Sequence, residues 1–228
     1  MTTPIPHAEP PGRWAQLAIL ATVLFLALVP WFSAASVAPQ IAAEWEISRL
    51  ETALLTVAVQ LGFVVGALIL AFSGAADVIP ARKLMAAGAL LAAVANAAFG
   101  MVAVDLPTAL PLRALSGAGI AAVYPVAMKV LAGWFRGGRG LAVGILTGAI
   151  TVGSALPHLL QAGGAVAGVE WRIVVLAATL PCLAAAGLAW RSAREGPMTT
   201  PARSRPVQAW RNTAAVMAGQ SAHTAIHG

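Results

Sequence analysis

The chain has 228 residues, of which 59% are hydrophobic and only 10% are charged, and its mean hydropathy is +0.82. Soluble domains are about 45–50% apolar and about 25% charged, so this composition excludes a soluble fold and indicates an integral membrane protein. The net charge of +6 does not indicate nucleic acid, because the basic residues lie in short connections between apolar runs and in a tail. The expected partner is therefore the lipid bilayer.

The sequence offers no metal-binding or catalytic constellation. Cys182 is the only cysteine, and the four histidines show no ligand spacing: His7, His158, His223 and His227. No nucleophile–base pair and no phosphate-binding loop is recognisable. We therefore predict no metal, no cofactor and no enzymatic activity.

The order of apolar runs predicts an all-α bundle of six transmembrane helices over residues 14–190. Residues 1–13 are rich in proline and predict a disordered leader. Six runs of membrane length follow: Trp14–Val37, about Thr52–Phe72, about Leu84–Val104, the stretch Leu110–Gly140, Gly140–Leu160 and Arg172–Trp190. Pro30 and Pro39 predict a kink or a break in the first run. Residues 191–209 then form a polar linker, and residues 210–228 resemble the incomplete start of a seventh helix.

Charge predicts the orientation of the six helices. One set of alternate connections contains Arg13, Arg82, Lys83, Arg136, Arg139, Arg191, Arg194, Arg203, Arg205 and Arg211. The other set contains only Arg49 and Arg172, together with Glu44, Glu46, Glu51, Asp105 and Glu170. The positive-inside rule places the Lys- and Arg-rich set in the cytoplasm, so the N terminus and the linker are both predicted to be cytoplasmic.

Arg113 is the strongest candidate for a functional residue. A charge inside an apolar span costs about 3 kcal/mol on insertion scales, so it normally serves a purpose inside the bundle. The alternative is that Arg113 extends to the nearby interface, since Asp105 and Pro107 begin the span close by. Lys129 in the same stretch is expected to extend toward the cytoplasmic boundary formed by Trp134 and Arg136.

Other candidates are polar residues and glycines within the spans. Gln60, Asn96, Tyr124 and Thr151 are candidates for lining a cavity, although isolated polar residues in a bundle more often form interhelical hydrogen bonds. Glycines at helical spacing predict close helix packing on three spans: Gly62 and Gly66, Gly117 and Gly119, and Gly140, Gly144 and Gly148.

Two motifs resemble those of the N-terminal half of a major facilitator superfamily transporter. The link Gly74-x-x-Asp77, followed by Arg82 and Lys83, resembles the cytoplasmic glycine–aspartate–basic signature of that family. Arg113-x-x-x-Gly117-x-Gly119 resembles its arginine–glycine signature, and residues 124–160 are similar to bacterial members. The chain departs from the family at Pro80-Ala81, which stand where the family usually has a glycine followed by an arginine pair, so that the basic pair comes one residue late. It also lacks the Gly-Pro pair of drug–proton antiporters.

The resemblance implies a fold and a function. The fold would be half of a twelve-helix transporter, built as two inverted three-helix repeats. Gly74, Asp77, Arg82 and Lys83 would form a gating loop, and Arg113 would face a central cavity and bind a solute such as an anion. We expect a truncated chain of a bacterial cytoplasmic membrane transporter that lacks its C-terminal half. The alternatives are a half-size transporter acting with a second copy and a non-transporting membrane scaffold.

Overall fold

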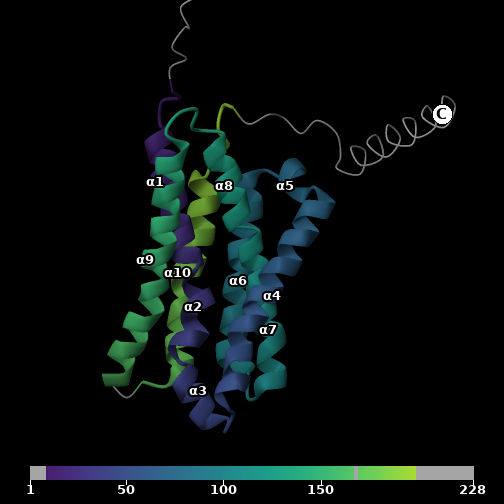
Figure 1. The fold of residues 1–228 in the computed structure, drawn as a ribbon, viewed down its shortest axis with the longest axis vertical. Coiled ribbons are helices and arrows are strands. Elements are labelled where there is room, and N and C mark those ends of the chain that lie inside the picture. Colours follow the sequence, from purple (N-terminus) through teal and green to yellow (C-terminus); the bar gives the residue numbers. More distant parts are fainter. Residues whose placement is uncertain (1–8, 167–168, 199–228) are drawn as a thin grey trace, which may run out of the picture.

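The computed structural model describes residues 9–166 and 169–198, and all regular structure in these ranges is α-helical. Residues 1–8 of the predicted leader, most of the predicted linker and the predicted start of a seventh helix lie outside them. The helices run along one bundle in six passes that alternate in direction (Figure 1), and we call each pass a crossing. The prediction of an all-α bundle is confirmed.

The crossings have the following bounds. The first comprises α1 (Arg13–Ala27), α2 (Val29–Ser36) and α3 (Ala38–Glu44). The second is α4 (Arg49–Ser73), followed by the short α5 (Ala75–Val78), and the third is α6 (Ala81–Val102). The fourth comprises α7 (Leu106–Ala121) and α8 (Tyr124–Ala132), the fifth is α9 (Arg139–Val166) and the sixth is α10 (Trp171–Ser192).

Five of these crossings contain stretches that are long and apolar enough to span a membrane: Arg13–Ser36, Arg49–Ser73, Ala81–Val102, Leu106–Ala132 and Trp171–Ser192. The remaining crossing, α9, has 28 residues, and its described apolar part is Arg139–Ala155. The fourth crossing begins at Leu106, earlier than the predicted Leu110, because Asp105 caps the helix. The Asp105 carboxylate accepts hydrogen bonds from the backbone N–H and the hydroxyl of Thr108.

Prolines divide the first and fourth crossings. The first is interrupted at Leu28 and again at Val37, and a proline stands in the first turn of both following helices, Pro30 in α2 and Pro39 in α3. The predicted break in this run is confirmed. The fourth is interrupted between α7 and α8, where Pro125 lies in the first turn of α8. Proline lacks a backbone N–H, so it is tolerated in a first turn but interrupts a continuous helix.

The helix contacts reveal two inverted units of three crossings. The first unit is α1–α6 and the second is α7–α10. The second crossing of each unit packs on the first crossing of the other, as α4 on α7 and α9 on α1. The third crossing does the same, as α6 on α7 and α10 on α1, and the two third crossings, α6 and α10, pack together. Because the units start from opposite ends of the bundle (Figure 1), they are related by inversion.

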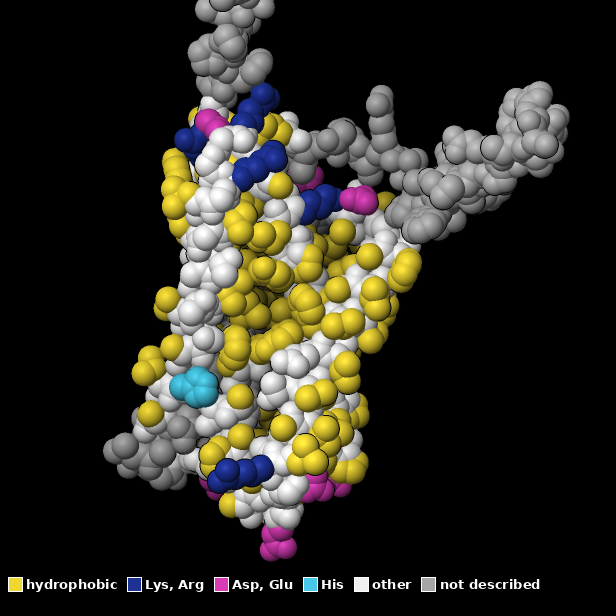
Figure 2. Space-filling model, in the orientation of Figure 1, with side chains coloured by type: hydrophobic (Ala, Val, Ile, Leu, Met, Phe, Trp, Pro, Cys, Tyr) yellow, Lys and Arg dark blue, Asp and Glu magenta, His cyan; other side chains and the backbone are white. Residues whose placement is uncertain are grey.

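The charged residues separate to opposite ends of the bundle. We call the end with residues 9–13, 74–83, 133–139 and 191–198 the basic end, and the end with residues 44–51, 103–106 and 169–172 the acidic end. Among the described residues, the basic end carries seven Lys or Arg against three acids, and the acidic end two Arg against five acids. Figure 2 shows this division. It also shows a recess lined by hydrophobic side chains between the α9 side and the α4 side of the bundle.

Candidate functional site

Arg113 lies on α7 and is buried, with 1% of its surface exposed. Its Nη1 donates to the carbonyl of Pro30 at 2.9 Å, and its Nη2 donates to the carbonyl of Trp31 at 2.8 Å. The guanidinium also lies over the Phe99 ring, 5.5 Å from its centroid. Its Nε is buried without a partner. Arg113 therefore does not face an open cavity in this structure, in contrast to our expectation, and it does not extend to the interface.

The surroundings of Arg113 are neutral. Every acid of the chain lies in a connection, a tail or the first or last turn of a helix: Glu9, Glu44, Glu46, Glu51, Asp77, Asp105, Glu170 and Glu195. The guanidinium contacts carbonyl oxygens and approaches the side-chain oxygen of Asn96 at 3.5 Å. Carbonyl dipoles solvate the cation but leave its net charge in place. The centre of the bundle therefore carries one positive charge with no carboxylate among its described contacts.

Asn96 on α6 connects three crossings beside Arg113. Its side-chain oxygen accepts a hydrogen bond from the Ser33 hydroxyl at 3.0 Å. Its amide group donates to the Val175 carbonyl at 2.9 Å and to the Thr179 hydroxyl at 3.0 Å. Asn96 is fully buried. It therefore forms interhelical hydrogen bonds, and it is the one polar candidate that the structure brings together with Arg113.

The other three polar candidates lie apart from this centre. Gln60 is exposed on α4, and Thr151 is exposed on α9, where its hydroxyl donates to the carbonyl of Thr147 at 3.1 Å. Tyr124 is partly buried at the start of α8 and packs against the hydrophobic core. These three residues do not form a common site in the described chain.

The glycines of α4 and α7 bring these two helices into close contact. A side chain at Gly62 would collide with the backbone of Ala114, and one at Gly117 would collide with the backbone of Val59. Gly66 and Gly119 are also tightly packed, against Ala118 and against Gly88 of α6 respectively. Packing is as predicted for these four glycines. The sequence analysis missed Gly88. The only sequence feature that indicates its packing is the run of alanines around it, which gives α6 a face of small residues.

The glycines of α9 behave differently. A side chain added at Gly140, Gly144 or Gly148 would meet nothing within 4 Å in the described chain. These three glycines therefore contact no other helix of the described chain, and their packing stays a prediction. Gly153 of α9 does pack: a side chain there would meet the backbone of Phe25 on α1 at 2.9 Å.

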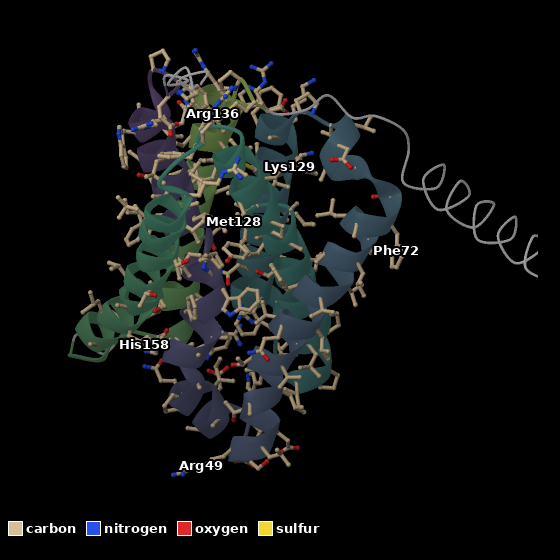
Figure 3. All side chains as sticks on the ribbon, turned by 45° about the horizontal axis from the view of Figure 1, so that its top comes forward. Arg49, Phe72, Met128, Lys129, Arg136 and His158 are labelled. Carbon is tan, nitrogen blue, oxygen red and sulfur yellow. The ribbon has the colours of Figure 1, made fainter. Side chains whose placement is uncertain are left out.

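The loop after α4 forms an ion pair with the end of the fourth crossing. Gly74 ends α4 with a φ of 64°, a left-handed conformation that favours glycine. This turn starts α5, which carries Asp77. Lys129 Nζ on α8 lies 2.6 Å from the Asp77 carboxylate and 2.6 Å from the carbonyl of Ala76. Lys129 therefore extends to the basic end, where its partner is Asp77 (Figure 3).

The basic residues of the predicted gating loop are not partners of Asp77. Arg82 and Lys83 are exposed at the start of α6, and neither forms an ion pair in the described chain. Beside the Asp77–Lys129 pair, a groove of about 190 Å³ lies between the last turns of α4 with α5 on one side and the end of α7 with α8 on the other. Small and apolar residues line it, among them Ala67, Leu70, Pro125 and Val126.

A second ion pair lies at the acidic end and was missed by the sequence analysis. The Glu44 carboxylate accepts hydrogen bonds from Arg172 Nη2 at 3.1 Å and from the Trp171 indole N–H at 2.5 Å. Arg172 Nη1 also donates to the carbonyls of Gly100 and Ala103, at 3.2 and 2.9 Å. The hydrogen bond from Trp171, with a contribution from Arg172, holds the pKa of Glu44 below its usual value.

Comparison with known proteins agrees with this architecture. The profile of the Major Facilitator Superfamily matches residues 20–223. The chain belongs to the Major Facilitator Superfamily. A search of curated proteins finds no significant match. Among solved structures, the chain is similar to a bacterial homologue of the human lysosomal transporter Spinster, crystallised in an inward-facing, unoccupied conformation. The TM-score is 0.72 at 20% identity, which shows a common fold.

That match covers 88% of this chain and 47% of the other, so the chain spans about half the length of the transporter structure it resembles. Together with the apolar helices, family membership establishes an integral membrane protein with the fold of one half of such a transporter.

Proposed function

We propose that this chain forms one half of a secondary transporter that moves a small anionic solute by alternating access. The observation that carries the proposal is the isolated charge of Arg113. A cation in a membrane interior is costly unless it has a partner or a function. Here its described contacts are neutral oxygens and a ring face, and one of its N–H groups has no partner. An anion entering the bundle would supply the missing charge.

Arginine also suits the chemistry of such a solute. Its planar guanidinium presents several N–H donors that match carboxylate or phosphate oxygens in a two-point contact. To reach Arg113 the solute must displace the carbonyls of Pro30 and Trp31, which lie just beyond the break at Leu28. Movement of α2 relative to α1 would expose the guanidinium, so the break is a natural place for the site to open.

The recess between α4 and α9 supports a second six-helix unit as the missing partner. Large apolar side chains are exposed on both helices, among them Leu61, Leu68, Phe72, Leu141 and Val152. The three bare glycines of α9 leave room for a helix to approach closely. The second unit would come either from a continuation of the chain or from a second copy, and the transport path would run between the units.

We place the protein in a bacterial cytoplasmic membrane with its basic end in the cytoplasm. The described charges, seven cations and three acids at one end against two cations and five acids at the other, support this orientation. Single cysteines replacing Arg82 and Glu46 test it in intact cells with an impermeant maleimide. We expect labelling of Glu46→Cys but not of Arg82→Cys, and the reverse pattern would refute the orientation.

Anion binding can be measured on the purified full chain in detergent. Acetate, benzoate, succinate and inorganic phosphate would each be added while thermal unfolding is monitored. A ligand at 100 times its Kd raises the free energy of unfolding by about 2.7 kcal/mol. We expect at least one anion to stabilise the wild type and Arg82→Gln, an exposed control, but not Arg113→Gln. Equal stabilisation of Arg113→Gln would contradict the proposal, and no stabilisation by any anion would favour the scaffold alternative.

A further inference from the structure

The basic end of the bundle carries four Lys and Arg side chains without a described partner. Three other cations of this end do have partners: Arg13 with Glu9, Arg136 with Met198 and Arg139 with Phe135. The remaining four form no side-chain hydrogen bond or ion pair within the described chain: Arg82, Lys83, Arg191 and Arg194. All four lie at the start of α6 or at the end of α10, two helices that pack together. The unpaired positive charge of this end is therefore concentrated at one pair of crossings.

A groove of about 230 Å³ opens between these two helices at the basic end. Arg82 in the first turn of α6 lines it from one side, and Arg194, two residues beyond the end of α10, lines it from the other. The remaining lining residues are Pro80, Ala81, Ala193 and Glu195. Two exposed arginines from crossings far apart in the sequence therefore meet at one small groove.

Hydrogen bonds hold the chain after α10 in place and so fix the shape of the groove. The backbone N–H of Arg194 donates to the side-chain oxygen of Gln16 at 3.1 Å, and its carbonyl accepts from the Trp134 indole N–H at 2.8 Å. The Glu195 carboxylate accepts from the backbone N–H of Ala81 at 3.0 Å. The partial positive charge of the α6 N-terminus offsets this carboxylate. The one acid that lines the groove is therefore already engaged, and positive charge dominates.

The groove lies at the level of the lipid headgroups. The membrane-length stretches of the two crossings begin at Ala81 and end at Ser192, within two residues of Arg82 and Arg194. Trp190 in the last turn of α10 is 54% exposed, and exposed tryptophan is typical of the membrane–water interface. Further into the membrane the same two helices expose apolar side chains, among them Leu90 on α6 and Leu183 on α10. A ligand with an anionic head and apolar tails would match both regions.

We propose that the groove between α6 and α10 binds the phosphate of an anionic phospholipid through Arg82 and Arg194. Guanidinium groups match phosphate oxygens in two-point contacts, and basic pockets between transmembrane helices suit lipid headgroups. Lys83 and Arg191 add positive charge beside the groove. The acyl chains lie along the exposed apolar side chains of α6 and α10, which favours a lipid over a soluble phosphate.

Native mass spectrometry of the purified full chain measures this lipid preference. The chain in detergent is mixed with equal amounts of dioleoyl phosphatidylglycerol, which is anionic, and dioleoyl phosphatidylcholine, which is zwitterionic. The ratio of the two complexes is then recorded. We expect phosphatidylglycerol to be preferred about tenfold or more, because each Lys or Arg near a membrane surface changes the binding of an anionic lipid by about fivefold.

Substitutions in the groove should lower this preference. Arg82→Gln and Arg194→Gln should each lower it about fivefold, and the double variant should remove it. Arg194→Lys keeps the charge and should retain most of the preference. Arg139→Gln at the same end and Arg49→Gln at the opposite end each remove one exposed charge outside the groove, so these matched controls should leave the preference unchanged. All four positions are exposed, so the variants should fold like the wild type.

Three results would overturn the inference. Equal retention of the two lipids by the wild type would mean that the groove does not select an anionic headgroup. An equal fall in Arg139→Gln and Arg194→Gln would indicate general attraction to charge. Displacement of phosphatidylglycerol by inorganic phosphate, but not by chloride at the same ionic strength, would indicate a site for a soluble anion. The outcome is independent of the proposed function, because the groove and the contacts of Arg113 share no residue.

Discussion

Two glycine faces of this protein have similar spacing and opposite surroundings. On α4 and α7, Gly62 and Gly117 allow two helix backbones to touch, and any side chain there would collide with the opposite backbone. On α9, Gly140, Gly144 and Gly148 follow one another at four-residue steps, yet nothing in the described chain approaches them. Glycine spacing therefore shows where a helix can be approached, and not whether the approaching helix belongs to the same six-helix bundle.

The largest effect should come from filling the packed face. Gly62→Leu places a branched side chain where the Ala114 backbone lies, so α4 and α7 must separate. Overpacking of this kind costs about 1–3 kcal/mol or more when the obstacle is backbone. We expect a loss of about 3 kcal/mol or a failure to fold, measured as the free energy of unfolding in mixed micelles. A stable Gly62→Leu chain would show that the α4–α7 contact is looser than described.

The next effect concerns the polar centre of the packed interior. Asn96→Leu removes the partner of Ser33, Val175 and Thr179 while keeping a side chain of similar size. Interhelical hydrogen bonds in membranes average about 0.6 kcal/mol each. A loss of about 1–2 kcal/mol is expected in the same unfolding assay, with Thr151→Val on the exposed surface of α9 as a neutral control. A change no larger than that of the control would mean that Asn96 does not join the crossings.

A smaller effect on stability should appear at the acidic end of the bundle and depend on pH. Glu44 lies outside the membrane-spanning stretches, and its pKa in the folded protein is below the ordinary value of 4.5. The groups in contact with it are Arg172, Trp171 and Trp45. A lowered pKa contributes stability that is complete above pH 4.5 and is lost as the pH falls through the folded value.

The Tm of the wild type should therefore exceed that of Glu44→Gln at pH 6, and the difference should shrink when the pH falls below about 4. Arg49→Gln, which removes an exposed charge nearby, controls for the net charge of this end. A difference that grew on acidification would reverse the sign and contradict the described hydrogen bonds to Glu44.

The smallest effect on stability is expected on the glycine face of α9. Gly144→Leu meets no atom of the described chain within 4 Å, so it should change the free energy of unfolding by about 0.5 kcal/mol or less. The contrast with Gly62→Leu tests the comparison directly. A large loss of stability in the chain alone would mean that α9 packs more closely than described.

Much of the fold was predictable because hydropathy and charge are local signals. The lengths of the apolar runs predicted the crossings, and the prolines predicted the break in the first crossing. The alternation of charge between connections predicted the basic and acidic ends. The predicted starts and ends of the helices were less accurate. Asp105 caps a helix that begins at Leu106, whereas hydropathy alone predicted a start at Leu110. The site was harder to predict, because it depends on distant residues. Arg113 was recognised as important, but its partners Pro30 and Trp31 are carbonyls about 80 residues away, which no side-chain pattern reveals.

The two ion pairs illustrate the same limit. Asp77 was identified from its motif, but its nearest basic neighbours in sequence, Arg82 and Lys83, are not its partners. The inverted arrangement of the units brings Lys129 to Asp77 and Arg172 to Glu44 across 52 and 128 positions of the chain. Charge in the sequence showed at which end each residue lies, and only the packing of the two units determined the pairs.

The account depends most on the proposal that a second six-helix unit covers α9, so the most direct measurement is accessibility at Gly144 in native membranes. A small lipid-soluble thiol reagent would be applied to Gly144→Cys and to Leu180→Cys, an exposed position on α10. We predict that Gly144→Cys is strongly protected and that Leu180→Cys reacts freely. Equal reaction at both positions would show that α9 faces lipid, and would contradict a transport path between two units on this face.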